Sequence, residues 1–552
     1  MTKFVFDNGK NLFESYDKSE ADNLLSEKAN AADVYSKSDT DTLLSGKANT
    51  ADVYDKAAVD TALAAKANAD DVYTKAQTDA AIGAILDDSE PLPNKTYSSD
   101  KINALINAHV YGFNINFDTK EVTYLADAVG FEPAHMDYTN DKFVYGSWRN
   151  AFFMPKPCML QRNGDVDFYL DPGNYDMRED GVTPSHVNHL GNVETSATSA
   201  NAYTADQYVV YDGALYLVTA DIAVGDTIQD GVNVSEVSDA PNVEDNAMIE
   251  WGQNNRRIWY KQVNESDGSV SIYISDQQMD SKYHAWSFFD AAANFKEHFY
   301  TPAYNGSLIN GVLRSIGGVD YTKLCQSKTG AQEVTAAELN NVGANKNWYT
   351  EVTSDMIIIC HLLTLMGKSL NTSLTYGNGR TGQPSAASSM LGTGTMNDKG
   401  MFWGSNTGTY GVKVFGMENW WGNQHRRTAG LVLNNNKWYY KLTRNTNDGS
   451  TASDYNSDGT GYLTKNHTAP ATNYVQEMFY TDDGAFYDKA TNATVGNTMY
   501  QDYFYANASG ARYLCRGGGC SSSAALCGAF YLYVSFAFSA ATWVVGASVS
   551  YR

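Results

Sequence analysis

Cysteine and histidine are the side chains of this sequence that could ligate a metal ion or act as a nucleophile. Cys520 and Cys527 lie close together near the C-terminus, and their thiolates could bind a soft metal ion such as copper. His284, His298 and His425 lie among aromatic residues, with no His-x-x-x-His or Cys-x-x-Cys spacing around them. We therefore predict packed or hydrogen-bonded histidines, free buried thiols, and no catalytic residue, metal site or cofactor.

Carboxylates are the other groups that could do chemistry, because a pair of them about 5 to 10 Å apart can cleave glycosidic bonds. The chain has 63 Asp and Glu, but no diagnostic pair stands out. Against 40 Lys and Arg they give a formal net charge of -23, which repels phosphate. We therefore predict a protein that is not an enzyme and does not bind nucleic acid, and keep a glycan depolymerase as the weaker alternative.

The elements that would position these residues follow from composition and pattern. At 552 residues the chain is long enough for several domains of about 100 to 200 residues, and 13% aromatics with 45 Gly indicate turn-rich β structure. We predict a β-rich domain over residues 112–330 and a second domain over residues 331–552. Apolar runs on both sides of Asp212 and Gly213 predict a hairpin within a small β module inserted at about residues 203–237.

The N-terminal segment is repetitive: a tyrosine recurs every 19 residues, followed by Lys at +2, Asp at +6 and an aliphatic residue at +9. The tyrosines are Tyr16, Tyr35, Tyr54 and Tyr73. Each repeat favours a short helix whose apolar stripe is too narrow to fold alone, so burial must come from other copies of the chain. We predict an α+β protein with a helical, coiled-coil-like repeat shaft over residues 1–86 that forms a homotrimer. A linker and short helix follow over residues 87–111.

Two sets of residues resemble known families. The phrases at residues 33–37 and 47–49, Asp-Val-Tyr-Ser-Lys and Lys-Ala-Asn, are similar to repeats of phage tail fibres and tail-spike stalks. Gly422-Asn423 and the later Arg516-Gly517-Gly518 resemble the family with the formylglycine-generating-enzyme type of C-type lectin fold. This likeness implies that residues 331–552 form a C-type-lectin-like, receptor-binding head. Within it, the likeness is closer to the target proteins of diversity-generating retroelements, whose last residues form a hypervariable ligand surface.

This resemblance implies a variable segment over about residues 516–552, because such systems mutate template adenines and can turn an Asn codon into Tyr, Ser, Phe, Ala, Thr, Val, Gly or Cys. Between residues 517 and 551 there is no Asp, Asn, Glu, Gln, Lys or Met, as such replacement would leave. The implied receptor-binding positions are Gly519, Cys520, Ser521, Ser522, Tyr533, Ser535, Phe536, Ala540, Thr542 and Val544. The implied scaffold residues are Leu532, Val534, Trp543, Gly546 and Val549, with Trp543 filling core and Gly546 permitting a turn.

The C-terminal segment has two other interpretations. Residues 524–549 carry no charge and are long enough to span a bilayer, but interior glycines and a strand-like alternation favour buried strands, so we predict no membrane insertion. The oxidase branch of the lectin-like family bears two cysteines after Arg-Gly-Gly. Cys520 is displaced from that spacing, and Gly528-Ala529 stands where basic residues are expected, which argues against catalysis.

Together these observations predict a phage tail-fibre adhesin that binds a bacterial cell-surface receptor, glycan or protein, through its C-terminal surface. The expected partners are two further copies of the chain and, through the N-terminus, phage tail or baseplate proteins. Residues 1–7 lack the features of a secretion signal, which fits a virion protein made in the host cytoplasm and located at the tail-fibre tip. The alternative is a bacterial or prophage-encoded surface protein with the same variable head.

Overall fold

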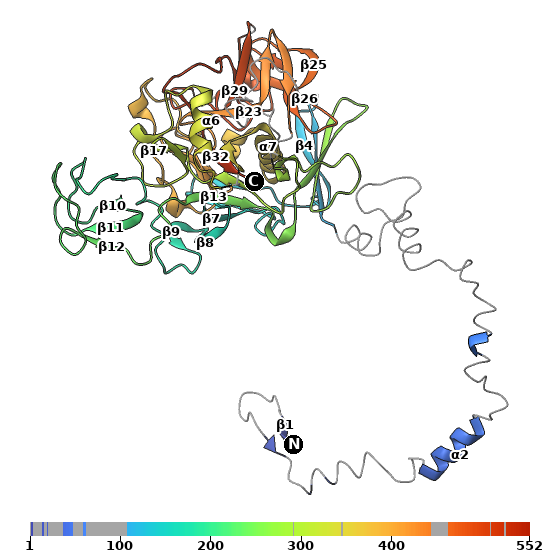
Figure 1. Cartoon of the computed structure of the whole chain (residues 1–552). Coiled ribbons are helices and arrows are strands. Elements are labelled where there is room, and N and C mark those ends of the chain that lie inside the picture. The colour runs from blue at the N-terminus through green and yellow to red at the C-terminus, as the bar shows by residue number, and fades with distance from the viewer. Residues whose placement is uncertain are drawn as a thin grey trace. The chain divides into compact units, whose positions relative to one another are not determined.

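The structure is a computed structural model of the whole chain (Figure 1). It describes residues 2–3, 14–15, 19, 22, 37–47, 59–61, 108–290, 292–343, 346–442, 462–507, 509–523 and 526–552. The chain divides into two compact units, one formed by residues 1–87 with 92–96 and the other by residues 88–91 with 97–552.

In the first unit, the described residues form a small strand pair and a short helix. Strands β1 (Thr2–Lys3) and β2 (Glu14–Ser15) pair antiparallel, and helix α2 spans Lys37–Lys47. Lys37 and Asp41 form an ion pair of 2.8 Å one turn apart, with side chains 90% and 64% exposed. These are the Lys and Asp of one repeat, and an exposed pair of this kind contributes little to stability.

The predicted α+β fold with a helical, coiled-coil-like shaft is wrong. The described residues form mostly β-sheet and include no long helical shaft. Helix α2 has 11 residues, short of the roughly 12 to 15 at which an isolated helix becomes stable, and its Leu43 is 44% exposed. The repeat tyrosines and most of the predicted short helix in residues 87–111 lie outside the described residues, although Val110 begins a strand.

The second unit is built around a largely antiparallel sheet that we call the central sheet, with the order β19-β32-β16-β13-β7-β8-β9. Its strands are β7 (Lys156–Leu160), β8 (Val166–Asp171), β9 (Asn174–Arg178), β13 (Asn246–Trp251), β16 (Phe299–Pro302), β19 (Trp348–Thr350) and β32 (Val549–Tyr551). The C-terminal strand β32 pairs with both β16 and β19. The predicted boundary between residues 330 and 331 therefore falls within a unit whose central sheet takes strands from both sides of it.

A second sheet, the outer sheet, has the order β14-β15-β3-β4. Its strands are β3 (Val110–Asn116), β4 (Glu121–Ala126), β14 (Trp259–Asn264) and β15 (Val270–Ser275). Alternate residues of β3 and β15, such as Phe113, Ile115, Ile272 and Ile274, are fully buried, so one face of this sheet packs on the core.

A third sheet, the C-terminal sheet, has the order β25-β24-β23-β29-β30-β28-β26-β27, with β31 paired to β23. Its strands are β23 (His425–Asn434), β24 (Lys437–Tyr440), β25 (Leu463–Thr468), β26 (Asn473–Tyr480), β27 (Phe486–Asn492), β28 (Tyr503–Ala506), β29 (Ala511–Arg516), β30 (Leu532–Val534) and β31 (Val545–Gly546). Figure 1 shows β23, β25, β26 and β29 of this sheet together at the top of the unit.

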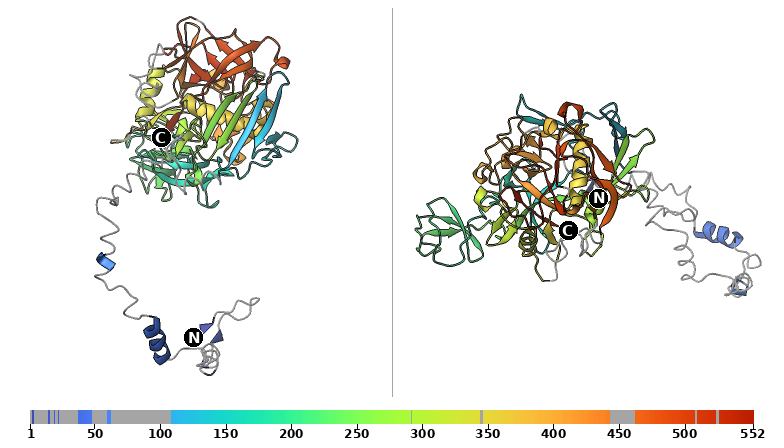
Figure 2. Two further views of the ribbon diagram at one scale, coloured as in Figure 1. Left: turned by 90° about the vertical axis from the view of Figure 1, so that its right-hand side faces the viewer. Right: turned by 90° about the horizontal axis from the view of Figure 1, so that it is seen from above.

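The predicted hairpin at Asp212–Gly213 is confirmed: β10 (Tyr208–Tyr211) pairs with β11 (Ala214–Val218), and β12 (Val234–Glu236) adds a third strand. This small sheet projects from the side of the unit (Figures 1 and 2). It has its own apolar cluster, made by Tyr203, Val209, Val218, Ile222, Ile228 and Val234. The remaining short strands are β5 (His135–Asp137), β6 (Lys142–Val144), β17 (Ser307–Ile309), β18 (Val312–Arg314), β20 (Trp403–Gly404), β21 (Val412–Val414) and β22 (Met417–Glu418).

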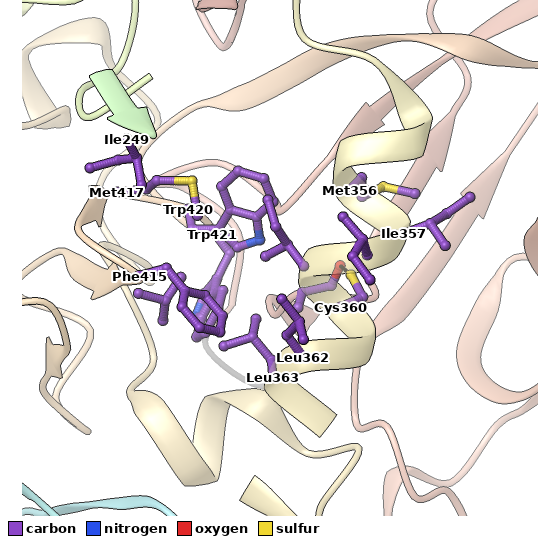
Figure 3. Packing of buried hydrophobic residues seen from close by; sticks show 14 of the residues in the cluster. Ile249, Met356, Ile357, Cys360, Leu362, Leu363, Phe415, Met417, Trp420 and Trp421 are labelled. Atoms are coloured by element: carbon purple, nitrogen blue, oxygen red, sulfur yellow. Dashed lines mark hydrogen bonds between the residues drawn. The ribbon is translucent and has the colours of Figure 1, made fainter. Parts of the chain in front are cut away.

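The core is organised by helix α7 (Thr353–Gly367), which is buried all round except at its last residue. Figure 3 shows Met356, Leu362 and Leu363 of this helix in the same cluster as Phe415 and Trp421. Other helices are α6 (Gly330–Glu338) and α8 (Thr372–Tyr376), with 3-10 turns η1 (Gln253–Asn255), η2 (Trp286–Phe288), η3 (Tyr321–Lys323), η4 (Ala387–Ser389), η5 (Asn397–Lys399) and η6 (Val495–Asn497).

Candidate functional site

The two motifs that carry the family resemblance meet in the structure. The backbone N–H of Gly422 donates to the carbonyl of Gly517 at 2.8 Å, and the N–H of Cys520 donates to the carbonyl of Asn423 at 2.9 Å. Gly517 and Gly518 have φ of 81° and 77°, which glycine tolerates best, and a Cβ at Gly518 would lie 2.2 Å from Cys527 Sγ. The glycines therefore let the C-terminal segment leave β29 through a tight turn.

Arg516 is buried beneath this turn and fixes it electrostatically. Its Nη2 donates to Glu351 Oε1 at 2.6 Å, its Nη1 donates to the Trp420 carbonyl at 2.8 Å, and its guanidinium lies 3.4 Å from the Trp420 ring centroid. Arg426 Nη1 reaches the same Glu351 oxygen at 3.3 Å. All three charged side chains are at most 3% exposed, so each is costly to bury unless the others remain.

Beyond β30, the backbone of the C-terminal segment is fixed by hydrogen bonds to the carbonyls of alternate residues. Five successive alternate carbonyls accept hydrogen bonds of 2.9 to 3.1 Å from fixed groups of the unit. The acceptors and donors are Phe536 with Tyr513 N–H, Phe538 with Gly330 N–H, Ala540 with Arg427 Nη2, Thr542 with Ser327 N–H, and Val544 with His425 N–H. Four of the five donors are backbone groups, so the path of this loop does not depend on the loop's own side chains.

The one side-chain donor in this set is itself fixed. Arg427 Nε donates to Glu333 Oε2 of α6 at 2.6 Å, and the two side chains are 2% and 0% exposed. Burial raises the pKa of Glu333 to about 7, and the Arg427 charge opposes that rise. The loop therefore rests on a buried pair that joins α6 to β23.

Side chains of the segment divide into a buried group and a half-buried group, which alternate within β30. Leu532, Val534, Gly546 and Val549 of the predicted scaffold are buried. The predicted variable residues of the same stretch are half-buried, namely Tyr533, Ser535, Phe536, Ala540, Thr542 and Val544. This division follows from the strand period of β30 and from the anchored loop after it.

Three details of the predicted scaffold and variable sets differ from their expected roles. Trp543 is half-buried against a small cluster that includes Leu324 and Met390, so it does not fill the main core. Gly546 does not make a left-handed turn; it lies in β31, where a Cβ would be 2.0 Å from the Cys325 carbonyl oxygen. Cys520 is fully buried, as is Gly519, whereas Ser521 is exposed and Ser522 half-buried.

Aromatic rings make up much of the half-buried surface. Tyr533 stacks on Tyr505 of β28, with centroids 4.8 Å apart and planes 4° apart, and on Phe536 at 4.9 Å. Tyr505 is 42% exposed and was not predicted from the sequence; alternation of Tyr503 and Tyr505 in a strand is the signal that could have found it. These rings offer a large contact area at small entropic cost.

His425 lies at the centre of the predicted positions. Its ring is 5.1 Å from that of Tyr533, a Cβ at Gly519 would lie 3.2 Å from its Cδ2, and its N–H binds the Val544 carbonyl. The structure therefore brings residues 519 and 533 next to the His425 ring and residue 544 next to its backbone. Burial lowers the pKa of His425 to about 4, so the imidazole is neutral at pH 7.

The cysteines do not have the features of reactive or metal-binding thiolates. All six are free and buried, as predicted, and burial raises the pKa of both the Cys520 and Cys527 thiols. Within the described ranges, no group of three or more His, Cys, Asp or Glu side chains could hold a metal ion. No described helix is long and apolar enough to cross a membrane.

The other two histidines are both half-buried near aromatic rings. His284 Nε2 bonds the Asp482 carbonyl at 3.1 Å, and its ring stacks on Trp286. The ring centroid of His298 is 6.4 Å from that of Tyr300, and its Nδ1 is buried without a partner among the described residues.

Comparison with known proteins adds no functional assignment. No protein-family model matches the chain, and no curated protein matches it.

Proposed function

We propose that this protein is a bacteriophage tail-fibre adhesin that binds a bacterial cell-surface receptor through the surface of residues 516–552. It acts by binding and not by catalysis. The proposal rests on the resemblance of its repeats to phage fibres and of its C-terminal motifs to retroelement-diversified proteins. In this proposal three copies of the chain assemble, and their N-terminal segments attach to tail or baseplate proteins.

The observation that best supports a variable binding surface is the anchoring of the loop after β30. Its alternate carbonyls are held mostly by backbone donors, while the side chains at the candidate positions are half-buried. Such a loop can change its side chains and keep its path, which is what a diversified contact surface requires. With three heads on one particle, a modest affinity per head suffices for firm attachment, because the second contact forms at high effective concentration.

The test compares binding of the full-length protein and of two triple variants to a panel of bacterial strains. The surface variant carries Tyr533→Asn, Phe536→Asn and Thr542→Asn. The control variant carries Asn at three exposed positions elsewhere, Val182, Val224 and Tyr410, whose side chains are 78%, 66% and 56% exposed. Circular dichroism and light scattering verify fold and oligomer size in all three proteins.

We expect strain-selective binding of the parent and of the control variant, and lost or redirected binding of the surface variant. Unchanged binding of a folded surface variant would contradict the proposal and place the receptor site elsewhere on the chain.

A further inference from the structure

A second candidate binding site lies away from the C-terminal segment. A cavity of about 560 Å³ opens between the outer sheet and the turn η2. Its walls are the rings of Trp259, His284, Trp286, Phe289 and Phe295. The volume falls within the range of about 300 to 1,000 Å³ that is typical of small-molecule sites. No residue of 516–552 contributes to the lining, so this site is outside the segment that the resemblance marks as variable.

Two of these rings are held in place by the turn between β26 and β27. Trp286 Nε1 donates to the carbonyl of Asp483 at 2.7 Å, and His284 Nε2 bonds the carbonyl of Asp482 at 3.1 Å. Because a carbonyl can only accept, His284 carries its proton on Nε2. Burial lowers the pKa of His284, which favours the neutral imidazole. The two rings stack with centroids 4.9 Å apart and planes 11° apart. This wall is therefore formed before any ligand arrives, which lowers the entropic cost of binding.

A second aromatic group lines the cavity beside this pair. Phe295 lies 4.9 Å from Phe289 and 5.4 Å from Trp259, measured between ring centroids, and is 38% exposed. Arg257 packs its guanidinium 4.3 Å from the Phe295 ring centroid and donates from Nε to the Lys296 carbonyl at 2.7 Å.

Polar groups with unused hydrogen-bonding capacity border these rings. Among the described residues, none pairs with the terminal nitrogens of Arg257 or with the side-chain amide of Gln277. Gln278 uses only its Nε2, which donates to the Tyr283 carbonyl at 3.3 Å, and keeps its amide oxygen available. The site thus combines flat apolar rings with donors and acceptors at their edges.

We infer that this cavity binds a pyranose sugar. One face of a pyranose presents C–H groups that pack on an aromatic ring, while its hydroxyls both donate and accept hydrogen bonds at the rim. A purely apolar ligand would bury the Arg257 and Gln277 polar groups without partners, which is costly. A nucleotide would bring phosphate to a chain of net charge -23. The inference goes beyond the proposed function, since it adds a sugar site outside the proposed receptor surface.

The test is saturation-transfer difference NMR on the full-length protein with the methyl pyranosides of glucose, galactose, mannose, N-acetylglucosamine and glucuronic acid. We expect saturation of ring C–H protons in at least one of them. Phe295→Ala and Gln277→Ala should each weaken the affinity for that sugar about tenfold. Tyr410→Ala, at an exposed ring outside the cavity, should leave this affinity unchanged. Phe295 is exposed and Gln277 is half-buried, and thermal melts verify that both variants fold.

The inference is overturned if none of the five sugars shows saturation transfer to the parent protein. It is also overturned if transfer persists at parental affinity in folded Phe295→Ala and Gln277→Ala. Strain binding by the parent protein is measured separately, so failure of the sugar site and failure of the proposed receptor surface are distinguishable.

Discussion

Asparagine substitutions at successive positions of β30 give the sharpest test of the division between scaffold and surface. Leu532 is fully buried; truncating a buried Leu costs about 2 to 5 kcal/mol, and an unpaired amide adds about 1 to 3 kcal/mol. Leu532→Asn should therefore lower the free energy of unfolding by about 3 kcal/mol or more. Tyr533→Asn removes, from a half-buried position, the two closest ring contacts of this residue, those with Tyr505 and Phe536, at about 0.5 to 1.5 kcal/mol each. Ser535→Asn should change stability by about 0.5 kcal/mol or less.

The assay is urea unfolding of the full-length protein, followed by tryptophan fluorescence, with a fitted midpoint and slope for each variant. The expected order of destabilisation is Leu532→Asn and Val534→Asn first, Tyr533→Asn well below them, and Ser535→Asn near zero. If Tyr533→Asn costs as much as Leu532→Asn, the tyrosine is a core residue and the surface assignment is refuted.

Three further outcomes follow from buried charged and titratable groups. Glu351→Gln leaves Arg516 without its carboxylate partner and should destabilise the protein by about 3 to 5 kcal/mol in urea unfolding, whereas Asp41→Asn, which breaks an exposed pair, should cost under about 0.5 kcal/mol. Burial lowers the pKa of His361 from 6.5 to about 3. The folded state therefore loses stability as the pH falls from about 6.5 toward 3, because over that range the unfolded chain binds a proton that the folded protein does not. His361→Gln should reduce the stability loss between pH 7 and 5 by about 2 kcal/mol. The six buried thiols should react with a dithionitrobenzoate reagent only after denaturation, and a thiol that reacts in the native protein would contradict their burial.

Local sequence patterns predicted parts of the β structure correctly. The hairpin at Asp212–Gly213 was predictable because its turn chemistry and its flanking apolar runs are adjacent in sequence. Alternation at residues 532–534 likewise predicted which side chains of β30 face the core. The helical shaft was wrong because helix propensity within one repeat does not reveal what, if anything, buries its apolar side.

The sequence could not reveal contacts between distant segments. Helix α7 is buried on all sides, and its polar residues Asp355, His361 and Thr364 are buried with the rest, so residues 353–367 show no helical period that distinguishes a buried helix from a buried strand. Strand β32 pairs with β16 across about 250 residues of sequence and with β19 across about 200. The sugar cavity needs Trp259, Trp286 and the Asp482 and Asp483 carbonyls, which only the fold brings together.

The relation between the two candidate sites is itself testable with a double-mutant cycle. The cavity and the C-terminal surface share no residue, although both contact the C-terminal sheet: Trp286 bonds the turn that follows β26, and Tyr533 lies in β30. Independent sites should show additive free energies within about 0.5 kcal/mol when Phe295→Ala and Tyr533→Asn are combined and binding to intact cells is measured. A coupling energy well above that value would mean that one receptor spans both sites, and the cavity would then be part of the receptor surface and not a separate sugar site.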